Sequence, residues 1–310
     1  MWETITQIAP YAVAYTIPLL MGSLSGLVSE RSGVINLCVE GYMLVGYFFS
    51  ALAISILQPI IGNSALFIGL IVAMIGGAIF SLLHAFASIS LRANQVISGT
   101  AINLIATALT VYIARNITGS GNISIMLGIV RSDVPLLNNI PIIGKLIFTN
   151  TYWSTWFCIG IWAFFWWLLY KTSFGLRLRA CGEHPSAVAS AGINVHKMRY
   201  IAVMMSGALG ALAGGVMIVT YSGEFNGSVA GLGFLGVAAM IFGQWKPLGI
   251  LGATFFFGIA TTIGNVSQLF ASLAAFPPVI FKVFPYAVTL IALVLFSKSS
   301  AAPKADGEPF

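Results

Sequence analysis

The chain has very little charge. Of its 310 residues, 7% are Asp, Glu, Lys or Arg, 58% are hydrophobic, and the mean hydropathy is +0.96. Soluble domains carry about 25% charged residues, so this composition excludes an ordinary water-soluble domain. About nine long apolar stretches indicate instead an integral membrane protein with several helical spans.

Cysteine and N-terminal basic residues are also scarce. The three cysteines, Cys38, Cys158 and Cys181, fall in or beside apolar segments, which excludes a disulfide framework. The start, MWETITQIAP, lacks the basic residues of a cleaved signal peptide and predicts an uncleaved first span. The formal net charge of +6 fits basic residues gathered in the cytoplasmic loops of a membrane protein better than nucleic-acid binding.

Motifs for nucleotide, metal or acid–base chemistry are missing. The nearest fragment to a Walker A loop, IPIIGKLI, has Leu146 after Gly144-Lys145 and lacks the upstream glycine. The three histidines are scattered, and His84, inside a span, is expected to be a hydrogen-bonded packing residue. We therefore expect no enzyme activity, and no metal or cofactor bound by this chain.

Apolar runs of about 20 residues each predict an all-α polytopic helical bundle with about 8–10 spans. The seventh run is too short to cross alone and is expected to be a broken or re-entrant segment. No domain boundary is visible, so residues 1–297 are expected to form a single membrane-spanning domain. The expected spans are 8–28, 34–57, 66–90, 96–115, 152–170, 200–221, 231–243, 249–270 and 280–297.

Lys and Arg predict the orientation of the chain in the membrane. With the loop 171–199 in the cytoplasm, ten basic residues lie inside and four outside, a clear positive-inside bias. The N-terminus is then outside and the C-terminus cytoplasmic. Residues 116–150 become an external loop, and residues 298–310, polar and proline-bearing, are expected to be a disordered cytoplasmic tail.

Two polar side chains stand near the start of the second expected span. Asn36 and Glu40 are four residues apart and would share one face of a helix. A charge at the centre of a membrane helix costs about 2.5–3.5 kcal/mol, so Glu40 must face the bundle or a wet cavity, or be protonated. Two readings stay open: the pair lines a translocation path, or it braces helices around Gly33 and Gly41.

The fourth expected span carries a polar stripe on an otherwise apolar helix. Such stripes face a lumen or a partner more often than lipid. Glu40 is the one carboxylate well placed inside a span, which argues against a sodium-coupled carrier. The candidate path residues are Asn36, Glu40, Gln95, Thr100, Asn103 and Thr107.

The cytoplasmic loop contains the sequence GLRLRACGEHPSAVASAGINVHKMRY. Its GEHP predicts a turn, and PSAVASAG predicts a short helix that begins at Pro185 and ends near Gly192. Such a helix of small side chains is either a docking helix for a cytoplasmic partner or an ordinary connector. The candidate coupling residues are Gly182, Glu183, His184, Pro185, Ser186, Ala187, Ala189 and Gly192.

This loop resembles the coupling segment in permease subunits of bacterial ABC importers. GLVSERSGVINLCVEGYMLVG (26–46) looks most like the nucleoside branch of the nucleoside, simple-sugar and branched-chain amino-acid permeases. NQVISGTAINLI (94–105) and GLGFLGVAAMIFGQWKPLGILGATFFFG (231–258) fit the same group, and the similarity covers roughly residues 11–297. Departures from the family pattern occur at Cys38, His184, Gln244 and Lys246.

The resemblance implies a channel-forming subunit with the bundle of type II (vitamin-B12-type) importers in the cell inner membrane. It would pair with a second permease, identical or not, and dock ATP-binding subunits that hold ATP and Mg. An external binding lipoprotein would deliver the substrate. A nucleoside is the expected substrate, ribose, another simple sugar or a branched-chain amino acid is the alternative, and a stand-alone secondary transporter or channel is the alternative of another class.

Overall fold

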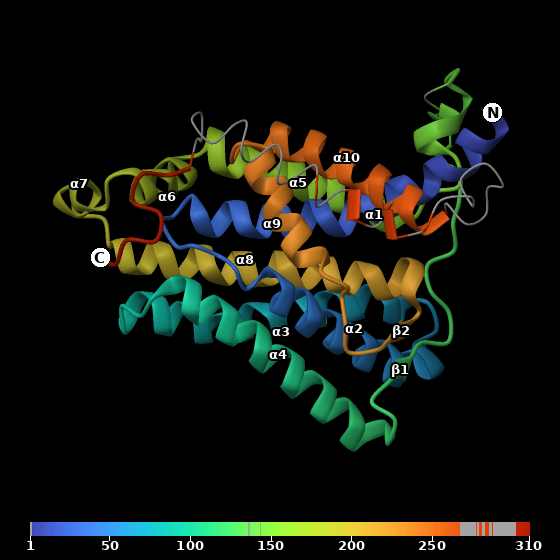
Figure 1. The fold of residues 1–310 in the computed structure, drawn as a ribbon, viewed down its shortest axis with the longest axis horizontal. Helices are drawn as coiled ribbons and strands as arrows, with labels where there is room; N and C mark the ends of the chain where they lie inside the picture. Colours follow the sequence, from blue (N-terminus) through green and yellow to red (C-terminus); the bar gives the residue numbers. More distant parts are fainter. Residues whose placement is uncertain are drawn as a thin grey trace.

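The computed structural model describes residues 2–266 apart from 136 and 143, isolated positions between 277 and 287, and residues 302–310. Within these ranges the chain is mostly helical, and the long helices run along the longest dimension of the molecule (Figure 1). Seven of them are long and apolar enough to cross a bilayer. The chain is therefore a multi-pass α-helical membrane protein, as predicted. The ninth expected span, 280–297, lies almost entirely outside the described residues.

The observed elements agree with the other expected spans to within a few residues, except at the second. Three short π-helical stretches and one 3₁₀ turn supplement the α-helices. In chain order the elements are α1 (Trp2–Glu30), α2 (Val39–Ile61), α3 (Ser64–Ala85), η1 (Phe86–Ser90), α4 (Gln95–Thr118), β1 (Ile123–Ser124), η2 (Leu137–Asn139), η3 (Gly144–Phe148), α5 (Trp153–Lys171), α6 (Ser173–Glu183), α7 (Pro185–Ser190), α8 (Val195–Met217), η4 (Ile218–Ser222), β2 (Glu224–Phe225), α9 (Leu232–Phe242) and α10 (Pro247–Val266).

Helix α8 forms the centre of the bundle, where it packs against α1, α2 and α3. Small residues allow these close crossings. A Cβ at Gly214 would overlap the carbonyl oxygen of Met43 in α2, and one at Gly207 would lie 2.5 Å from the carbonyl oxygen of Gly77 in α3. The glycine spacing of α8 therefore serves helix packing.

Helix α9 is too short to span the membrane. Its 11 residues cover about 16 Å at ~1.5 Å per residue, against a hydrocarbon core of about 30 Å. It packs against α1 and α10, and its first residues lie beside the start of α2. The expected broken segment at 231–243 is thus present as a half-length helix buried by its neighbours.

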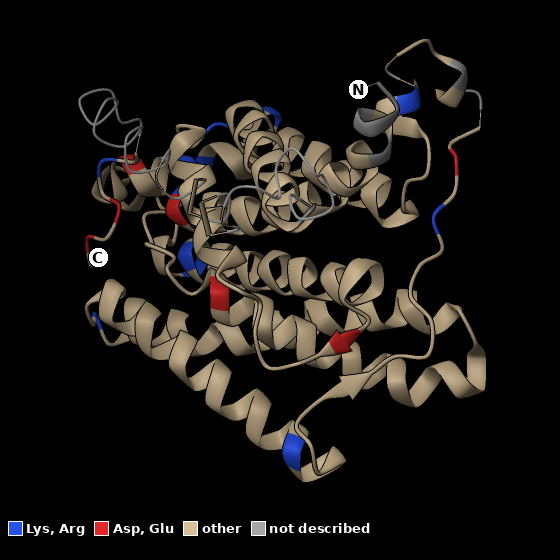
Figure 2. Cartoon of the chain, turned by 45° about the vertical axis from the view of Figure 1, so that its right-hand side comes forward, with Lys and Arg blue, Asp and Glu red and all other residues tan. Residues whose placement is uncertain are grey.

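The two ends of the bundle carry different loops. Helices α6 and α7 and the C-terminus lie at one end, and the N-terminus, β1 and β2 lie at the other (Figure 1). Strands β1 and β2 pair antiparallel and tie the segment after α4 to the segment after α8. Most charged residues drawn in Figure 2 gather toward the α7 end. The loops 171–199 and 116–150 therefore lie at opposite ends, as expected.

Two expectations about local structure were wrong. The second span begins at Val39 instead of residue 34, because Gly33 adopts a φ of 89° and residues 31–38 form no helix. Residues 302–310, expected to be disordered, are ordered in two successive turns. Pro303 and Ala305 are buried there because the backbone of this stretch bonds to the α7 end of the bundle.

Candidate functional site: a buried irregular segment and a projecting helix

The segment between α1 and α2, residues 31–38, runs through the protein interior. Residues 31–33 continue the end of α1 as a turn, and residues 34–37 have no regular secondary structure. Val34, Asn36 and Cys38 are buried. Backbone N–H and C=O groups inside a membrane bundle have no water to bond, so each needs a partner from the protein. The polar residues predicted to line a path lie around this segment.

Two amide side chains of α4 supply partners for this backbone. The Oε1 atom of Gln95 accepts a hydrogen bond from the Ile35 N–H at 2.7 Å. The Nδ2 group of Asn103 donates to the Leu37 carbonyl at 2.8 Å, and its Oδ1 atom accepts from the Gly41 N–H at 2.8 Å. Both amides therefore join α4 to the 31–38 segment and the start of α2.

His84 and Ser29 supply hydrogen-bond donors for two carbonyl groups of the same segment. The Nε2–H group of His84 donates to the Ile35 carbonyl at 3.1 Å, so its Nδ1 atom accepts from the Ser98 hydroxyl at 2.9 Å. The hydroxyl of Ser29 donates to the Val34 carbonyl at 2.8 Å. The interpretation of His84 as a hydrogen-bonded packing residue is thus confirmed.

Asn36 belongs to the irregular segment and not to a helix. Its Nδ2 group donates to the Ser206 hydroxyl of α8 at 2.6 Å, and its Oδ1 atom accepts from the Cys38 N–H at 3.0 Å. Ser206 also lies 3.0 Å from the Ser25 hydroxyl of α1. Asn36 therefore ties the segment to two helices, and it does not share a helical face with Glu40.

Glu40 binds the N-terminus of α9. Its Oε1 atom accepts from the Gly231 N–H at 2.9 Å, and its Oε2 atom accepts from the N–H groups of Gly233 at 2.7 Å and Phe234 at 3.3 Å. The first N–H groups of a helix have no partner within it, and the helix dipole favours a negative charge there. This geometry favours the bracing reading over the path reading for Glu40.

Thr100 and Thr107 differ from the other candidates because they are exposed on α4. Their hydroxyls donate to carbonyls of the same helix, to Ile97 at 2.9 Å and to Asn103 at 3.0 Å. The six candidates thus form two sets: four lie around residues 35–41, and two lie on the outer face of α4.

Helix α7 begins at Pro185, as the sequence predicts, and Gly192 follows it with a φ of 79°. Among its residues only Val188 is fully buried, whereas Ser186, Ala187 and Ala189 are exposed. Figure 1 shows α7 at the extreme end of the molecule, beyond the long helices. It presents a small, smooth surface that a second protein can contact.

The turn predicted at GEHP is helical at Gly182 and Glu183, which end α6, so that only His184 separates α6 from α7. Contacts from this end of α6 reach the irregular segment. A Cβ at Gly182 would lie 2.5 Å from the Arg31 carbonyl oxygen, and the Oε1 atom of Glu183 lies 3.8 Å from Nη1 of Arg31. Arg31 in turn donates from Nη2 to the Trp245 carbonyl at 2.7 Å. The Nε1–H group of Trp245 donates to Oε2 of Glu30 at 2.6 Å.

Glu30, Arg31 and Trp245 were not predicted as functional residues, although they lie within the stretches that carry the family resemblance. A Glu-Arg pair directly before Ser32-Gly33 was the available signal, because two charges at the end of an apolar run need specific partners. The structure joins them into a link between the end of α6, the end of α1 and the turn after α9.

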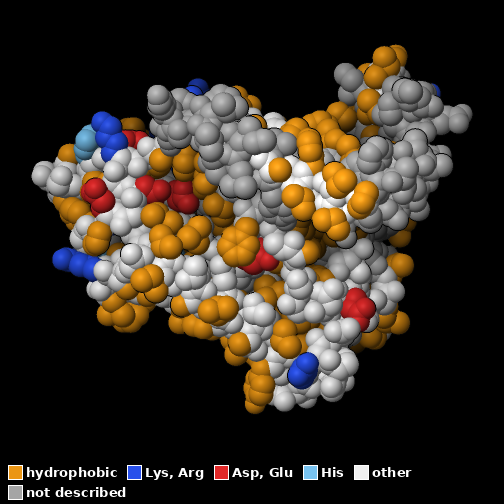
Figure 3. All heavy atoms as spheres, viewed as in Figure 1, with side chains coloured by type: hydrophobic (Ala, Val, Ile, Leu, Met, Phe, Trp, Pro, Cys, Tyr) orange, Lys and Arg blue, Asp and Glu red, His pale blue; other side chains and the backbone are white. Residues whose placement is uncertain are grey.

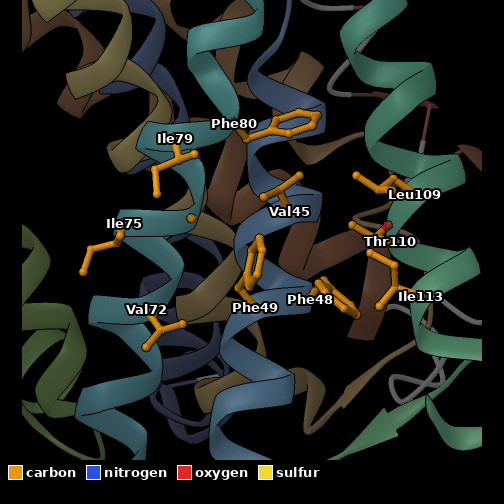
Figure 4. A pocket seen from close by; sticks show the side chains of 11 residues that line it. Val45, Phe48, Phe49, Val72, Ile75, Ile79, Phe80, Leu109, Thr110 and Ile113 are labelled. Carbon is orange, nitrogen blue, oxygen red and sulfur yellow. The ribbon is translucent and has the colours of Figure 1, made fainter. Parts of the chain in front are cut away.

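A cavity of about 350 Å³ lies between α2, α3 and α4 (Figure 4). Phe48, Phe49 and Ile113 are among the residues that line this cavity. Thr110 also lines it, and the Thr110 hydroxyl donates to the Ala106 carbonyl of α4 at 2.7 Å. A hydroxyl-rich solute needs several convergent polar groups, so this cavity is not suited to bind one. The described residues also contain no group of three or more His, Cys, Asp or Glu that could hold a metal ion.

Seven spans with irregular backbone buried inside the bundle are typical of a membrane transport protein. The chain matches the family described as branched-chain amino acid transport system, permease component, over residues 8–293, and it belongs to that family. This agrees with the resemblance seen in the sequence.

Several curated relatives are similar along most of the chain. The guanosine ABC transporter permease protein NupQ of Bacillus subtilis is 41% identical over 99% of this chain and 97% of its own length. The nucleoside ABC transporter permease protein NupC of Lactococcus lactis subsp. cremoris is 38% identical, over 98% and 96%. The guanosine ABC transporter permease protein NupP of Bacillus subtilis is 27% identical, over 83% and 71%. No solved structure matches the chain.

Proposed function

We propose that this chain is the permease subunit that forms the translocation path of an ATP-driven nucleoside importer. The observation that carries the proposal is the full-length similarity to NupQ and NupC, both named as permeases of ABC transporters for nucleosides. In this proposal ATP and Mg are bound by a separate ATP-binding subunit, and this chain performs no catalysis.

The second permease of the complex is proposed to be a different chain. Bacillus subtilis has two proteins named as guanosine ABC transporter permeases, NupQ and NupP, and this chain is 41% identical to the first and 27% to the second. This contrast supports a heterodimer in which the partner resembles NupP. An external binding lipoprotein delivers the substrate, the N-terminus is outside, and the α7 end is cytoplasmic.

Within the path, the outer face of α4 is the proposed contact for the substrate. Thr100 and Thr107 expose hydroxyls on a helix that is otherwise largely apolar and partly unpacked. Uncharged hydroxyls suit a neutral solute. Asn36, Glu40, Gln95 and Asn103 act instead as braces that hold the irregular segment and α9 beside that path.

Helix α7, with residues 182–184 before it, is proposed to dock the ATP-binding subunit. Its exposed small side chains offer a surface that a groove can enclose, and Glu183–Arg31 connects it to the buried segment. Movement of α7 therefore has a direct route to the centre of the bundle.

An ion-coupled carrier is disfavoured by the positions of the acidic residues. Of the acidic side chains, Glu30 and Glu40 lie within spans. Both carboxylates accept hydrogen bonds from N–H groups of the protein, Glu30 from Trp245 and Glu40 from the start of α9. Neither is left available to bind a coupling cation.

Uptake of radiolabelled guanosine in cells tests this proposal. We expect uptake that depends on the chain, disappears in a strain lacking the ATP-binding subunit, and is inhibited by excess unlabelled nucleosides but not by ribose or leucine. Uptake that persists without the ATP-binding subunit would contradict the ABC mechanism. Competition by ribose or leucine instead of nucleosides would assign the path to that substrate class.

A further inference from the structure

Residues 302–310 lie across the α7 end of the bundle. In Figure 1 this stretch, drawn in red, passes between α6 and the ends of α1 and α8. Two turns shape it: the Asp306 N–H donates to the Pro303 carbonyl at 3.3 Å, and the Glu308 N–H donates to the Ala305 carbonyl at 3.2 Å. Ala305 is only 4% exposed, so the stretch is packed into the protein surface.

Backbone hydrogen bonds join the 302–310 segment to two functional regions at once. The Ala305 N–H donates to the Gly182 carbonyl, at the end of α6, at 2.8 Å. The Gly307 N–H donates to the Gly33 carbonyl, in the irregular segment, at 3.3 Å. The 302–310 segment therefore connects the end of α6 to the 31–38 segment through its own backbone, separately from the Glu183–Arg31 pair.

The guanidinium of Arg199 strengthens the same junction. Arg199 is 2% exposed, and it donates from Nε to the Ser32 carbonyl at 3.2 Å and from Nη1 to the Glu308 carbonyl at 2.8 Å. Burial raises the pKa of Asp306 to about 7, while the charges of Arg199 and Arg31 act in the opposite direction. A buried arginine on the central helix thus holds both backbones.

Glycines permit the close approach of these backbones. A Cβ at Gly33 would lie 2.8 Å from Nη2 of Arg199 and 3.1 Å from the Ala305 carbonyl oxygen. Gly307 has a φ of 82°, and a Cβ there would lie 2.6 Å from Cδ1 of Ile35. A positive φ and the lack of space both favour glycine at Gly33 and Gly307. The close contact between the 302–310 segment and the 31–38 segment therefore depends on these two glycines.

We propose that the 302–310 segment is a coupling latch that holds the end of α6, directly before α7, to the 31–38 segment, so that movement of α7 is transmitted to the interior. The inference rests on the proposed function, because it assigns a partner-driven motion to α7. The latch residues are positioning residues: they contact neither the substrate nor ATP. Without the latch, the end of α6 keeps its own contacts with Arg31 and α8 but loses the backbone connection to the 31–38 segment, so that the motion of α7 is transmitted less completely.

Deletion of residues 302–310 in the assembled transporter tests the latch. The complex, with its ATP-binding subunits, second permease and binding protein, is reconstituted in vesicles, and ATP hydrolysis and guanosine uptake are measured together. We expect hydrolysis to continue, the KM for guanosine to stay unchanged, and guanosine imported per ATP to fall at least about fivefold, the lower range of coupling between sites.

Two point variants refine the test. Gly307→Val keeps the length of the chain but places a side chain against Ile35, and it should lower the transport ratio in the same direction. Lys304→Ala changes an exposed side chain of the same segment and should leave the ratio unchanged. Equal ratios for Gly307→Val, the deletion and the full-length chain would overturn the proposal.

Cross-linking tests the docking of the segment independently of transport and of the stability of the deletion variant. The rings of Phe310 and His196 lie 5.9 Å apart, so a photoreactive amino acid at position 310 should cross-link to the start of α8. Absence of that cross-link in the assembled complex would overturn the latch. A full-length complex that hydrolyses ATP without any uptake would contradict the proposed function, whatever the cross-link shows.

Discussion

Glu40→Leu is expected to abolish most guanosine uptake. Leucine removes the acceptor for the N–H groups of Gly231 and Gly233, whose hydrogen bonds are partly buried, and of Phe234, whose hydrogen bond is exposed. Each buried donor left without a partner costs about 1–3 kcal/mol, and 1.4 kcal/mol corresponds to about a tenfold change in an equilibrium. Uptake should therefore fall at least about tenfold, together with the melting temperature of the detergent-solubilised chain.

The matched variants separate bracing from path lining. Glu40→Gln keeps a carbonyl oxygen as an acceptor, so it should lie between the wild type and Glu40→Leu in stability and leave the KM for guanosine unchanged. Glu224→Gln removes an acidic group in β2, at the opposite end, and serves as the control. A Glu40→Leu variant with normal uptake and stability would refute the bracing role, and a raised KM at normal stability would place Glu40 in the path.

Ala189→Pro is expected to uncouple ATP hydrolysis from transport. Proline inside a helix removes a backbone hydrogen bond and costs about 3 kcal/mol or more, which should unfold a helix as short as α7. Val188 is the buried residue of α7, and the long helices pack mainly on one another, so the chain should still insert. A loss of more than about 1.4 kcal/mol of binding free energy weakens binding at least about tenfold. In reconstituted complexes, binding of the ATP-binding subunit and uptake should therefore both fall at least about tenfold.

Two further substitutions test the same region. Ala189→Ser keeps a small exposed side chain and should couple normally. Glu183→Lys places a second positive charge beside Arg31 and should lower transport per ATP while leaving insertion intact. Normal binding of the ATP-binding subunit by Ala189→Pro would show that α7 is only a connector between α6 and α8.

The helical type of the spans, and the positions of those that the structure describes, could be predicted from the sequence because apolar length largely determines them. The start of α2 could not, since a buried irregular stretch such as VINLC has the same composition as a helix start. Gly33 was the one sequence signal for a break in the helix, but a glycine within an apolar run is also tolerated in membrane helices. The polar residues Gln95 and Asn103 of α4 are visible in the sequence, whereas their partners, the backbone groups of Ile35 and Leu37, depend on tertiary packing.

The 302–310 segment shows a second limit. Its composition is polar and contains proline, which predicts disorder. Order there comes from backbone bonds to Gly182 and Gly33 and from the Arg199 guanidinium, and composition contains no information about such partners. The space-filling view of Figure 3 shows acidic and basic side chains together at this end of the molecule. The short helix that begins at Pro185, in contrast, was predicted well because proline and glycine mark its two ends.

Transport into vesicles tests most directly whether this chain forms the translocation path while a separate subunit hydrolyses ATP. The purified chain alone should accumulate no guanosine against a gradient, even with a proton or sodium gradient imposed. Addition of the second permease, the ATP-binding subunits, the binding protein and ATP should produce concentrative uptake. Uphill transport by the single chain, powered by an ion gradient, would contradict the account.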